Sequence, residues 1–572
     1  MLTEETMTAK AEEWLSPIYD EATRNEVKQL IEEGGEPLTD AFYKDLEFGT
    51  GGMRGIMGAG TNRINKYTLG AATQGLSNYL KTAFSDEQVK VAIAYDCRNN
   101  SDTFAKIVAD VFSANGIQVY LFESLRPTPE LSFSIRHLNC HSGIVLTASH
   151  NPKEYNGYKV YWNDGAQLVP PHDKNVIEEV RKVAVKDVNF TANDALITLI
   201  GEELDETFRK TVVAQSMTND GKEDLSIVFT SIHGTSIKAV PQALEAAGFT
   251  QVHVVEEQAE PNGNFPTVVS PNPEEAEALT MALEKADKIN ADMVIGTDPD
   301  ADRIGIAVRD FDGNMTLLNG NQTAVVLTWY MLDQWKKANK LTGKEFIAET
   351  IVTTNLLKDI ADAYGVKTYF CLTGFKWIAE IIRNLEGKEK FICGGEESYG
   401  FMIGDFVRDK DSVTASLIAA EIAAWSKAQG SSLFEQLIQI YTQFGHYQER
   451  LISITKKGKS GADEIQQMMA DFRQKTPETV NGVKVVKTID YQTSEEKDIV
   501  EGSTSSIDFP ASNVFQILLE DGSVITARPS GTEPKIKFYI SVKGTLDTVE
   551  NYASAKAELE QKIDAIVSSM NL

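Results

Sequence analysis

Cysteine is scarce in this sequence, with four residues among 572. These are the widely scattered Cys97, Cys140, Cys371 and Cys393. They form no CxxC pair, and no Cys/His cluster has the spacing of a zinc site. A structural zinc site of the common kinds is therefore excluded, and we expect the four thiols to be reduced.

Basic residues are also in deficit, since 55 Lys and Arg against 83 Asp and Glu give a formal net charge of −28. Binding to nucleic acid or to an anionic membrane needs a basic surface, so neither partner is expected. Long apolar runs are missing too, and none can span a bilayer. The N-terminal MLTEETMTAKAEEWL is acidic where a signal peptide would be basic and then apolar. We therefore expect a cytoplasmic protein.

What is present is a repeated alternation of apolar, β-branched stretches with segments of helical periodicity. Three passes of this pattern can be followed: 89–96, 117–123 and 142–152; 225–234, 251–256 and 291–302; 345–352, 366–374 and 390–400. Such alternation predicts α/β units with largely parallel sheets, whose functional loops lie beyond the strand ends.

A chain of this length is too long for one hydrophobic core. We predict three related α/β domains with mixed or parallel sheets, at 1–205, 206–318 and 319–444, and a fourth, α+β domain at 445–572. The fourth combines a β-meander with a closing helix over 545–569, and residues 1–40 are expected to form helices that cover the first domain.

The first of four polar loops, LTASHNPKEYNGYK (146–159), directly follows an apolar stretch. Ser149 and His150 therefore lie at the end of a buried strand, where the chain turns. Taken alone, this pattern fits an ordinary turn serine equally well.

The second loop, GTDPDADR (296–303), carries three alternating aspartates: Asp298, Asp300 and Asp302. Pro299 argues against a helix interior, so an extended loop would point the three carboxylates to one side. Their oxygens repel one another unless a hard cation neutralises them, and Mg²⁺ is the favoured ion. An EF-hand is excluded, because its sixth and twelfth positions are Arg303 and Arg309 here rather than Gly and Glu.

The third loop, GGEESYGF (394–401), suits hydrogen bonding to sugar hydroxyls, with Glu396 accepting and Ser398 donating or accepting. Glu396 fits a surface charge equally well when taken alone. Thr373 and Gly374, at the end of the stretch 366–374, complete the candidate substrate-binding residues of this part of the chain.

The fourth loop, ARPSGTEPKIKFY (527–539), offers a guanidinium fork, hydroxyls and converging backbone N–H groups. The residues concerned are Arg528, Ser530, Gly531 and Thr532. They form a candidate phosphate clamp in an otherwise acidic protein. Near the N-terminus, Arg54 lies in a Gly-rich segment (48–65) that has neither the P-loop nor the Rossmann pattern, and it would stabilise a transferring phosphoryl group.

Together the motifs TASHNP, DxDxDR, GEES and RPSGTEP, in this order and one per domain, resemble the α-D-phosphohexomutase family over nearly the whole chain. The resemblance implies four domains around a central cleft and a phosphorylated Ser149. It also implies Mg²⁺ bound by Asp298, Asp300, Asp302 and an oxygen of the phosphoserine.

The resemblance further implies a role for each remaining candidate. Arg303 would lie beside the phosphoryl group, and Arg54 and His150 are further catalytic candidates. Lys159 and Lys410 match two active-site lysines, and which of them handles the hydroxyl proton stays open. The fourth loop would bind the phosphate that is not reacting.

The implied reaction interconverts glucose 1-phosphate and glucose 6-phosphate, with glucose 1,6-bisphosphate as intermediate and activator. GEESYG, where relatives that accept mannose read GEMSGH-like, favours glucose by analogy. GTDPDADR departs from the family's GDGDGDR-like string but keeps all three carboxylates. We expect a phosphosugar as the substrate and a monomer or weak homodimer.

Other activities are compatible with these residues. A phosphopentomutase or a glucose 1,6-bisphosphate synthase would use the same serine, metal and clamp. An aspartyl phosphatase of the DxDx[TV] type would use Asp298 as its nucleophile, although its [TV] position is Asp302 here. A scaffold protein without activity would require a broken site, whereas every expected residue is present.

Overall fold

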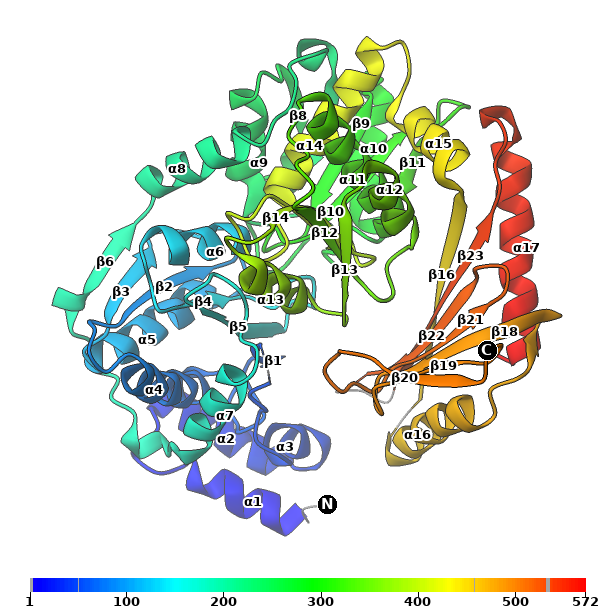
Figure 1. The fold of residues 1–572 in the computed structure, drawn as a ribbon. Coiled ribbons are helices and arrows are strands. Elements are labelled where there is room, and N and C mark those ends of the chain that lie inside the picture. The colour runs from blue at the N-terminus through cyan, green and yellow to red at the C-terminus, as the bar shows by residue number, and fades with distance from the viewer. Residues whose placement is uncertain (1–3, 50, 457, 531–534) are drawn as a thin grey trace.

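The structure is a computed structural model that describes residues 4–49, 51–456, 458–530 and 535–572. Within these residues the strands form four sheets (Figure 1). We call the sheets with their surrounding helices the first, second, third and fourth units, in chain order. None of the described helices is long and apolar enough to cross a membrane.

The first unit is built on a six-stranded sheet. Its strands are β1 (Gly52–Ile56), β2 (Lys90–Tyr95), β3 (Gln118–Phe122), β4 (Ser142–Leu146), β5 (Tyr155–Trp162) and β6 (Ile197–Ile200). Its helices are α4 (Lys66–Ala83), α5 (Ser101–Ala114), α6 (Thr128–His137) and α7 (His172–Lys182). The strand order is β1-β5-β4-β2-β3-β6, with β2 parallel to both β3 and β4, and β5 antiparallel to both β4 and β1.

The second unit has a five-stranded sheet with the order β11-β10-β9-β7-β8. The strands are β7 (Ser226–Thr230), β8 (Gln251–Val254), β9 (Met293–Thr297), β10 (Ile304–Arg309) and β11 (Met315–Leu318). The helices are α8 (Glu202–Val213), α9 (Ser236–Ala246) and α10 (Ala276–Ile289).

The third unit has a four-stranded sheet with the order β13-β12-β14-β15. The strands are β12 (Glu345–Thr350), β13 (Lys367–Cys371), β14 (Lys390–Glu396) and β15 (Gly400–Ile403). The helices are α11 (Gly320–Lys337), α12 (Leu356–Tyr364), α13 (Phe375–Leu385), α14 (Ser412–Ala428) and α15 (Leu433–Phe444).

These three sheets share one order of four strands: β5-β4-β2-β3, β10-β9-β7-β8 and β15-β14-β12-β13. In each sheet a polar loop joins the two strands of an antiparallel pair, β4 with β5, β9 with β10, and β14 with β15. The predicted α/β class and the relation among the three units are confirmed. The positions of the antiparallel return strands were not predicted. Residues 155–159, assigned to the first loop, belong to β5: all five pair with β1, and Lys159 also pairs with β4.

The fourth unit is different, because its described strands pair only in the antiparallel sense. The strands are β16 (His446–Thr455), β17 (Thr479–Val480), β18 (Val483–Asp490), β19 (Glu495–Asp498), β20 (Ser503–Ser506), β21 (Phe515–Leu519), β22 (Val524–Pro529) and β23 (Lys535–Gly544). The helices are α16 (Gly458–Gln474) and α17 (Tyr552–Met570). The predicted meander corresponds to β21, β22 and β23, but the closing helix begins at Tyr552 rather than near 545, because a short 3₁₀ turn over Val549–Asn551 precedes it.

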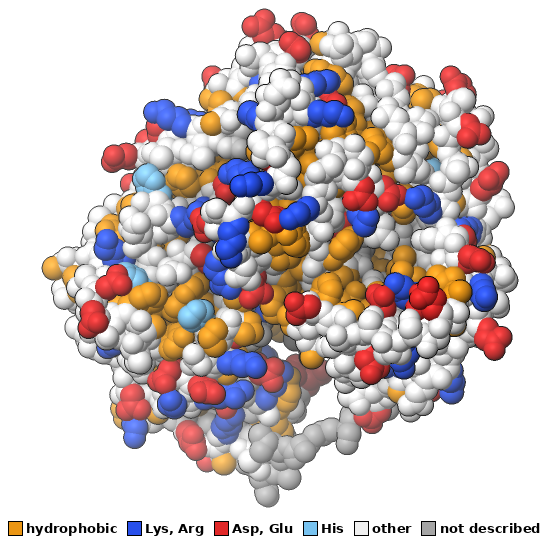
Figure 2. Space-filling model, in the orientation of Figure 1, with side chains coloured by type: hydrophobic (Ala, Val, Ile, Leu, Met, Phe, Trp, Pro, Cys, Tyr) orange, Lys and Arg blue, Asp and Glu red, His pale blue; other side chains and the backbone are white. Residues whose placement is uncertain are grey.

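The N-terminal segment forms α1 (Glu4–Glu13), α2 (Glu21–Glu33) and α3 (Gly35–Phe42). Trp14 stacks on Tyr19 with ring centroids 4.5 Å apart, and both rings contact Tyr67 of α4. The predicted helices therefore cover the first unit. In Figure 2 the surface is hollowed between the first unit, at lower left, and the fourth unit, at lower right. The predicted domain boundaries stay a prediction.

Candidate active site

Ser149 lies just beyond β4 in a conformation that is unusual for a residue with a side chain. Its φ of 50° is in the left-handed region. The backbone N–H of Ser149 donates to Thr147 Oγ1 at 2.8 Å, and the residue is only 4 % exposed. Its hydroxyl donates to Asp298 Oδ2 at 2.6 Å. A serine of the first unit thus contacts a carboxylate of the second.

The aspartate loop between β9 and β10 is a tight turn rather than the extended segment that was predicted. Ala301 has a φ of 59°, and its N–H donates to the carbonyl of Asp298 at 3.0 Å. Asp298 Oδ1 also accepts from the backbone N–H groups of Asp302 and Arg303, at 3.0 and 2.9 Å. The turn still brings the three carboxylates together, because one oxygen from each lies within 4.8 Å of the others.

Residues outside the sequence motifs brace this turn from two sides. Thr128, at the start of α6, donates to Asp300 through its hydroxyl and through its N–H, each at 2.9 Å. Thr235, before α9, donates twice to the carbonyl of Pro299. Both threonines lie at helix starts, where residues of this kind are common, so only the fold reveals that they contact the aspartate loop.

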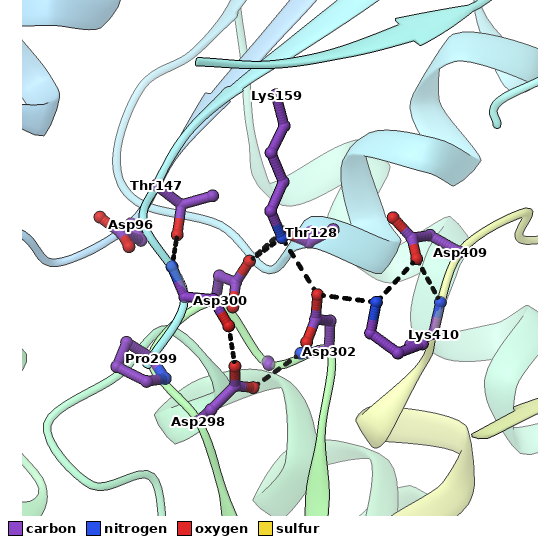
Figure 3. Close-up of polar contacts among 12 residues, drawn as sticks. Asp96, Thr128, Thr147, Lys159, Asp298, Pro299, Asp300, Asp302, Asp409 and Lys410 are labelled. Atoms are coloured by element: carbon purple, nitrogen blue, oxygen red, sulfur yellow. Dashed lines mark hydrogen bonds and ion pairs between the residues drawn. The ribbon is translucent and has the colours of Figure 1, made fainter. Parts of the chain in front are cut away.

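Two buried lysines neutralise the carboxylates (Figure 3). Lys159 Nζ of β5 lies 2.7 Å from Asp300 Oδ2 and 3.0 Å from Asp302 Oδ2, and Lys410 Nζ lies 3.2 Å from the latter oxygen. Burial alone would raise the pKa of Asp302, but these ammonium groups and Arg303 hold it below its ordinary value. The three units therefore meet at Asp302.

The donor set of this cluster fits a hard divalent cation. Burial, followed by the charges of Asp300 and Asp302, raises the pKa of Asp298 well above its ordinary range. Among the described residues, Asp300 Oδ1 and Asp302 Oδ1 make no hydrogen bond although both are buried. Three convergent carboxylates with unused oxygens match the preference of Mg²⁺ for oxygen ligands.

His150 and Arg54 lie beside the serine. His150 Nδ1 is 3.3 Å from Ser149 Oγ. Burial, with the neighbouring charges of Arg303 and Arg54, lowers the pKa of His150 to about 3, so its ring is neutral at pH 7. Arg54 of β1 donates to Asn151 Oδ1 at 2.8 Å, which places its guanidinium against the serine loop.

The third loop contacts the second directly. Arg303 forms a β-bridge with Gly400, and its guanidinium pairs with Glu274. Gly400 cannot be replaced easily, since an added Cβ would lie 2.1 Å from the Lys410 side chain. Glu396 ends β14, and burial raises its pKa. The sugar-binding candidate Glu396 is thus buried near the lysine and arginine of the site.

The other candidates of the third unit lie at the edge of this cluster. Ser398 is half-buried in the turn after Glu396. Thr373 and Gly374 come directly before α13, and Gly374 has a φ of 112°. The next residue, Phe375, has its ring 5.5 Å from Lys410 Nζ.

The fourth loop approaches the third. Arg528 lies near the end of β22, opposite Lys537 of β23, and Ser530 N–H donates to the carbonyl of Lys535 at 2.7 Å. Burial and Glu396 raise the pKa of Glu397 to about 7, and the charges of Lys537 and Arg528 oppose that rise. Among the described residues, no hydrogen bond or ion pair joins Arg528 to Ser149 or to the aspartates. Gly531 and Thr532 lie outside the described residues.

Sequence comparison relates this chain to one family of known proteins. Four models of one family match the chain in order: phosphoglucomutase/phosphomannomutase alpha/beta/alpha domain I at residues 45–186, domain II at 206–313, domain III at 319–442, and the C-terminal domain at 464–559. A phosphoglucomutase of Staphylococcus aureus (strain MRSA252) is 41 % identical over 509 residues, which cover 88 % of this chain and 91 % of that protein.

The chain belongs to the phosphoglucomutase/phosphomannomutase family. It is therefore an enzyme, an intramolecular phosphotransferase of the isomerase class. The family fold recurs in a putative phosphomannomutase from Thermus thermophilus, at 21 % identity with a TM-score of 0.65 over 91 % of this chain and 99 % of that one. It recurs also in the open form of parafusin from Paramecium, at 19 % identity with a TM-score of 0.66 over 92 % and 96 %.

Proposed function

We propose that this phosphoglucomutase/phosphomannomutase family member interconverts glucose 1-phosphate and glucose 6-phosphate through a phosphorylated Ser149. The observation that carries the proposal is the 2.6 Å hydrogen bond from Ser149 Oγ to Asp298, one of three converging carboxylates. The name phosphoglucomutase of the Staphylococcus aureus relative supports glucose phosphates as substrates.

Asp298, Asp300 and Asp302 would hold Mg²⁺, together with an oxygen of phospho-Ser149. Bound there, Mg²⁺ would neutralise part of the negative charge on the phosphoryl oxygens. Lys159 already lies against two of these carboxylates, and Arg54 and Arg303 add cations at the edges of the site. Fixed cations of this kind stabilise the charge that develops in phosphoryl transfer.

In the first half-reaction the bond between Ser149 Oγ and phosphorus breaks, and a new bond forms between phosphorus and the free hydroxyl oxygen of the sugar phosphate. The hydroxyl loses its proton and Ser149 Oγ gains one, so the products are glucose 1,6-bisphosphate and free serine. The bisphosphate then turns end for end. The phosphoryl group that the sugar carried at the start moves from its sugar oxygen to Ser149 Oγ, and that sugar oxygen gains a proton while Ser149 Oγ loses one.

The remaining candidates would bind the sugar and its second phosphate. Glu396 and Ser398 would contact sugar hydroxyls, with Thr373 and Gly374 beside them. Arg528 and Ser530, with Gly531 and Thr532, would bind the phosphate that is not reacting. This clamp must accept the phosphate of either end of the sugar, because both half-reactions use it.

The test is a coupled assay of the parent enzyme and Ser149→Ala on glucose 1-phosphate, mannose 1-phosphate and ribose 1-phosphate, with glucose 1,6-bisphosphate added. We expect glucose 1-phosphate to be the preferred substrate and Ser149→Ala to retain less than about a hundredth of the activity. A preference for ribose 1-phosphate would contradict the proposal and indicate a phosphopentomutase.

Asp298→Asn is the matched variant. Labelling by a phosphoryl donor should disappear in Ser149→Ala and persist in Asp298→Asn. The reverse pattern would identify Asp298 as the nucleophile, as in an aspartyl phosphatase.

A further inference from the structure

A buried arginine that the proposed mechanism does not use lies directly beneath the serine loop. Arg98 follows β2 and is 3 % exposed. Its two terminal nitrogens donate to four backbone carbonyls of the segment that begins at the serine. The acceptors are Ser149 at 2.6 Å, Asn151, Pro152 at 2.8 Å and Tyr155 at 3.0 Å.

The number and direction of these hydrogen bonds require an arginine. A guanidinium presents its donors in a rigid planar fork, whereas a lysine ammonium is one point on a flexible stem. Four carbonyls that converge on one side chain fix the path of the chain from Ser149 to the start of β5. One of them belongs to Ser149 itself, whose left-handed φ is rarely adopted by residues with a side chain.

The charge of Arg98 is balanced locally. Its Nε lies 3.6 Å from Asp96 Oδ2, and both side chains are fully buried. Asp96 Oδ1 also accepts from the Arg98 N–H and from the Ser101 hydroxyl, each at 2.9 Å. Because Asp96 pairs with it, the guanidinium adds little net charge at the phosphoryl position, and its contribution is geometric.

The second unit closes the other side of Arg98. The guanidinium carbon lies 5.2 Å from the centroid of the Phe265 ring, and Asn99 Nδ2 donates to Asn264 at 3.0 Å. Gly263 lies so close that an added Cβ would be 2.3 Å from Asn99 N and 2.8 Å from Arg98 C. The unit that supplies the aspartates therefore also packs on the residue that shapes the serine loop.

We infer that Arg98 is a positioning residue, which holds the backbone of residues 149–155 so that the Ser149 hydroxyl points at Asp298. The inference rests on the proposed phosphoserine role of Ser149. In the described contacts, Arg98 touches neither the Ser149 hydroxyl nor the carboxylates of the aspartate loop. Its removal should therefore slow phosphoryl transfer without weakening substrate binding to the same extent.

The experiment compares the parent, Arg98→Ala, Arg98→Lys and Arg126→Ala, all as full-length protein. Arg126 is the matched control: a buried arginine of the first unit that pairs with Asp205 through two hydrogen bonds, at 2.7 and 2.8 Å. We expect Arg98→Ala to lower kcat at least about tenfold while KM changes less than about threefold. Arg126→Ala should lower the unfolding temperature but keep kcat within about twofold.

Two further readouts separate positioning from general stability. Guanidinium ion, at concentrations that leave the parent folded, should restore part of the kcat of Arg98→Ala and none of any loss in Arg126→Ala. Hydrogen exchange of the amides in residues 147–155 should be faster in Arg98→Ala and unchanged in Arg126→Ala. If Arg98→Ala does not fold, Arg98→Lys and Gly263→Ala supply the same comparison, with smaller decreases in kcat.

An Arg98 variant with parental kcat, or with parental exchange in residues 147–155, would overturn the inference. The inference would also be overturned if kcat fell in proportion to the decrease in unfolding temperature, and to the same degree, in the Arg98 and Arg126 variants. A parent enzyme that converts no phosphosugar would contradict the proposed function, and the exchange measurement would then still decide whether Arg98 holds the loop.

Discussion

The loops of the first three units and the loop of the fourth are joined to the rest of the molecule in different ways. Ser149, Asp302 and Lys410 come from three units with one strand order, and short hydrogen bonds and ion pairs join their loops. The fourth unit is an antiparallel sheet, and its described hydrogen bonds and ion pairs with the third unit lie away from the Arg528 loop. Gln516 donates to the carbonyl of Ile351 at 2.8 Å.

This difference corresponds to the two proposed tasks of the site, phosphoryl transfer and substrate binding. The groups proposed to transfer the phosphoryl group are positioned by contacts that exist without substrate, whereas the placement of Arg528 depends on how the fourth unit packs on the third. Changes at the first three loops should therefore affect the chemical step. Changes in the fourth unit should affect substrate binding in both directions of the reaction.

Metal removal should lower turnover more than any of the substitutions below. Asp298, Asp300 and Asp302 are buried, and without a cation they are balanced mainly by Lys159 and Lys410. We expect EDTA to lower turnover more than about a hundredfold, and added Mg²⁺ to restore it. The measurement is the coupled assay on metal-depleted enzyme, and full activity of that enzyme would mean that the aspartates form no catalytic metal site.

Arg528→Ala should have the next largest effect. A charge-assisted hydrogen bond contributes about 1.5–3 kcal/mol, so kcat/KM should fall roughly tenfold to a hundredfold. The loss should be similar with glucose 1-phosphate and with glucose 6-phosphate, because the proposed clamp would bind whichever phosphate is not reacting. Steady-state kinetics in both directions tests this, and a loss confined to one direction would refute a shared clamp.

Glu396→Gln should change the preference between sugars. It should not simply lower kcat/KM equally in both directions of the reaction, as Arg528→Ala should. Glu396 is buried at the end of β14, where it would contact a sugar hydroxyl. We expect the ratio of kcat/KM for glucose 1-phosphate to that for mannose 1-phosphate to change by about tenfold. Arg528→Ala is the control and should leave the ratio nearly constant; the opposite result would reverse the roles of the two loops.

Asp359→Asn should have the smallest effect. Asp359 Oδ2 accepts from Tyr447 and from Lys543, each at 2.7 Å, and so joins the third and fourth units. Because Asp359 and Lys543 are partly exposed, we expect KM to rise by no more than about fivefold while phosphorylation of Ser149 is unchanged. A fall in Ser149 phosphorylation would show that the two tasks are not separate.

Much of this organisation could be predicted from the sequence. Buried apolar strands that end in polar loops indicated the α/β units, and the loop motifs indicated Ser149, the aspartates and Lys159. The strands β5, β10 and β15 could not be predicted, because a strand that follows a loop within a few residues looks like part of that loop. The tight turn at Ala301 was also missed, since alternating aspartates suggested an extended segment.

The supporting residues were missed for a different reason. Arg98, Thr128 and Thr235 act through contacts between segments that are far apart in the chain. Hydrophobic periodicity and short motifs describe local sequence only. For the same reason, the sequence indicated Arg528 as a candidate but could not give its distance from Ser149.

The central claim is that Ser149 carries the phosphoryl group between the two ends of the sugar. The most direct test is intact-mass analysis with peptide mapping, after incubation with glucose 1,6-bisphosphate and again after addition of excess glucose 1-phosphate. We predict one phosphoryl group on the peptide that contains Ser149, lost when it passes to the added sugar phosphate. An unmodified Ser149 in an active enzyme, or a phosphoryl group on another residue, would contradict the account.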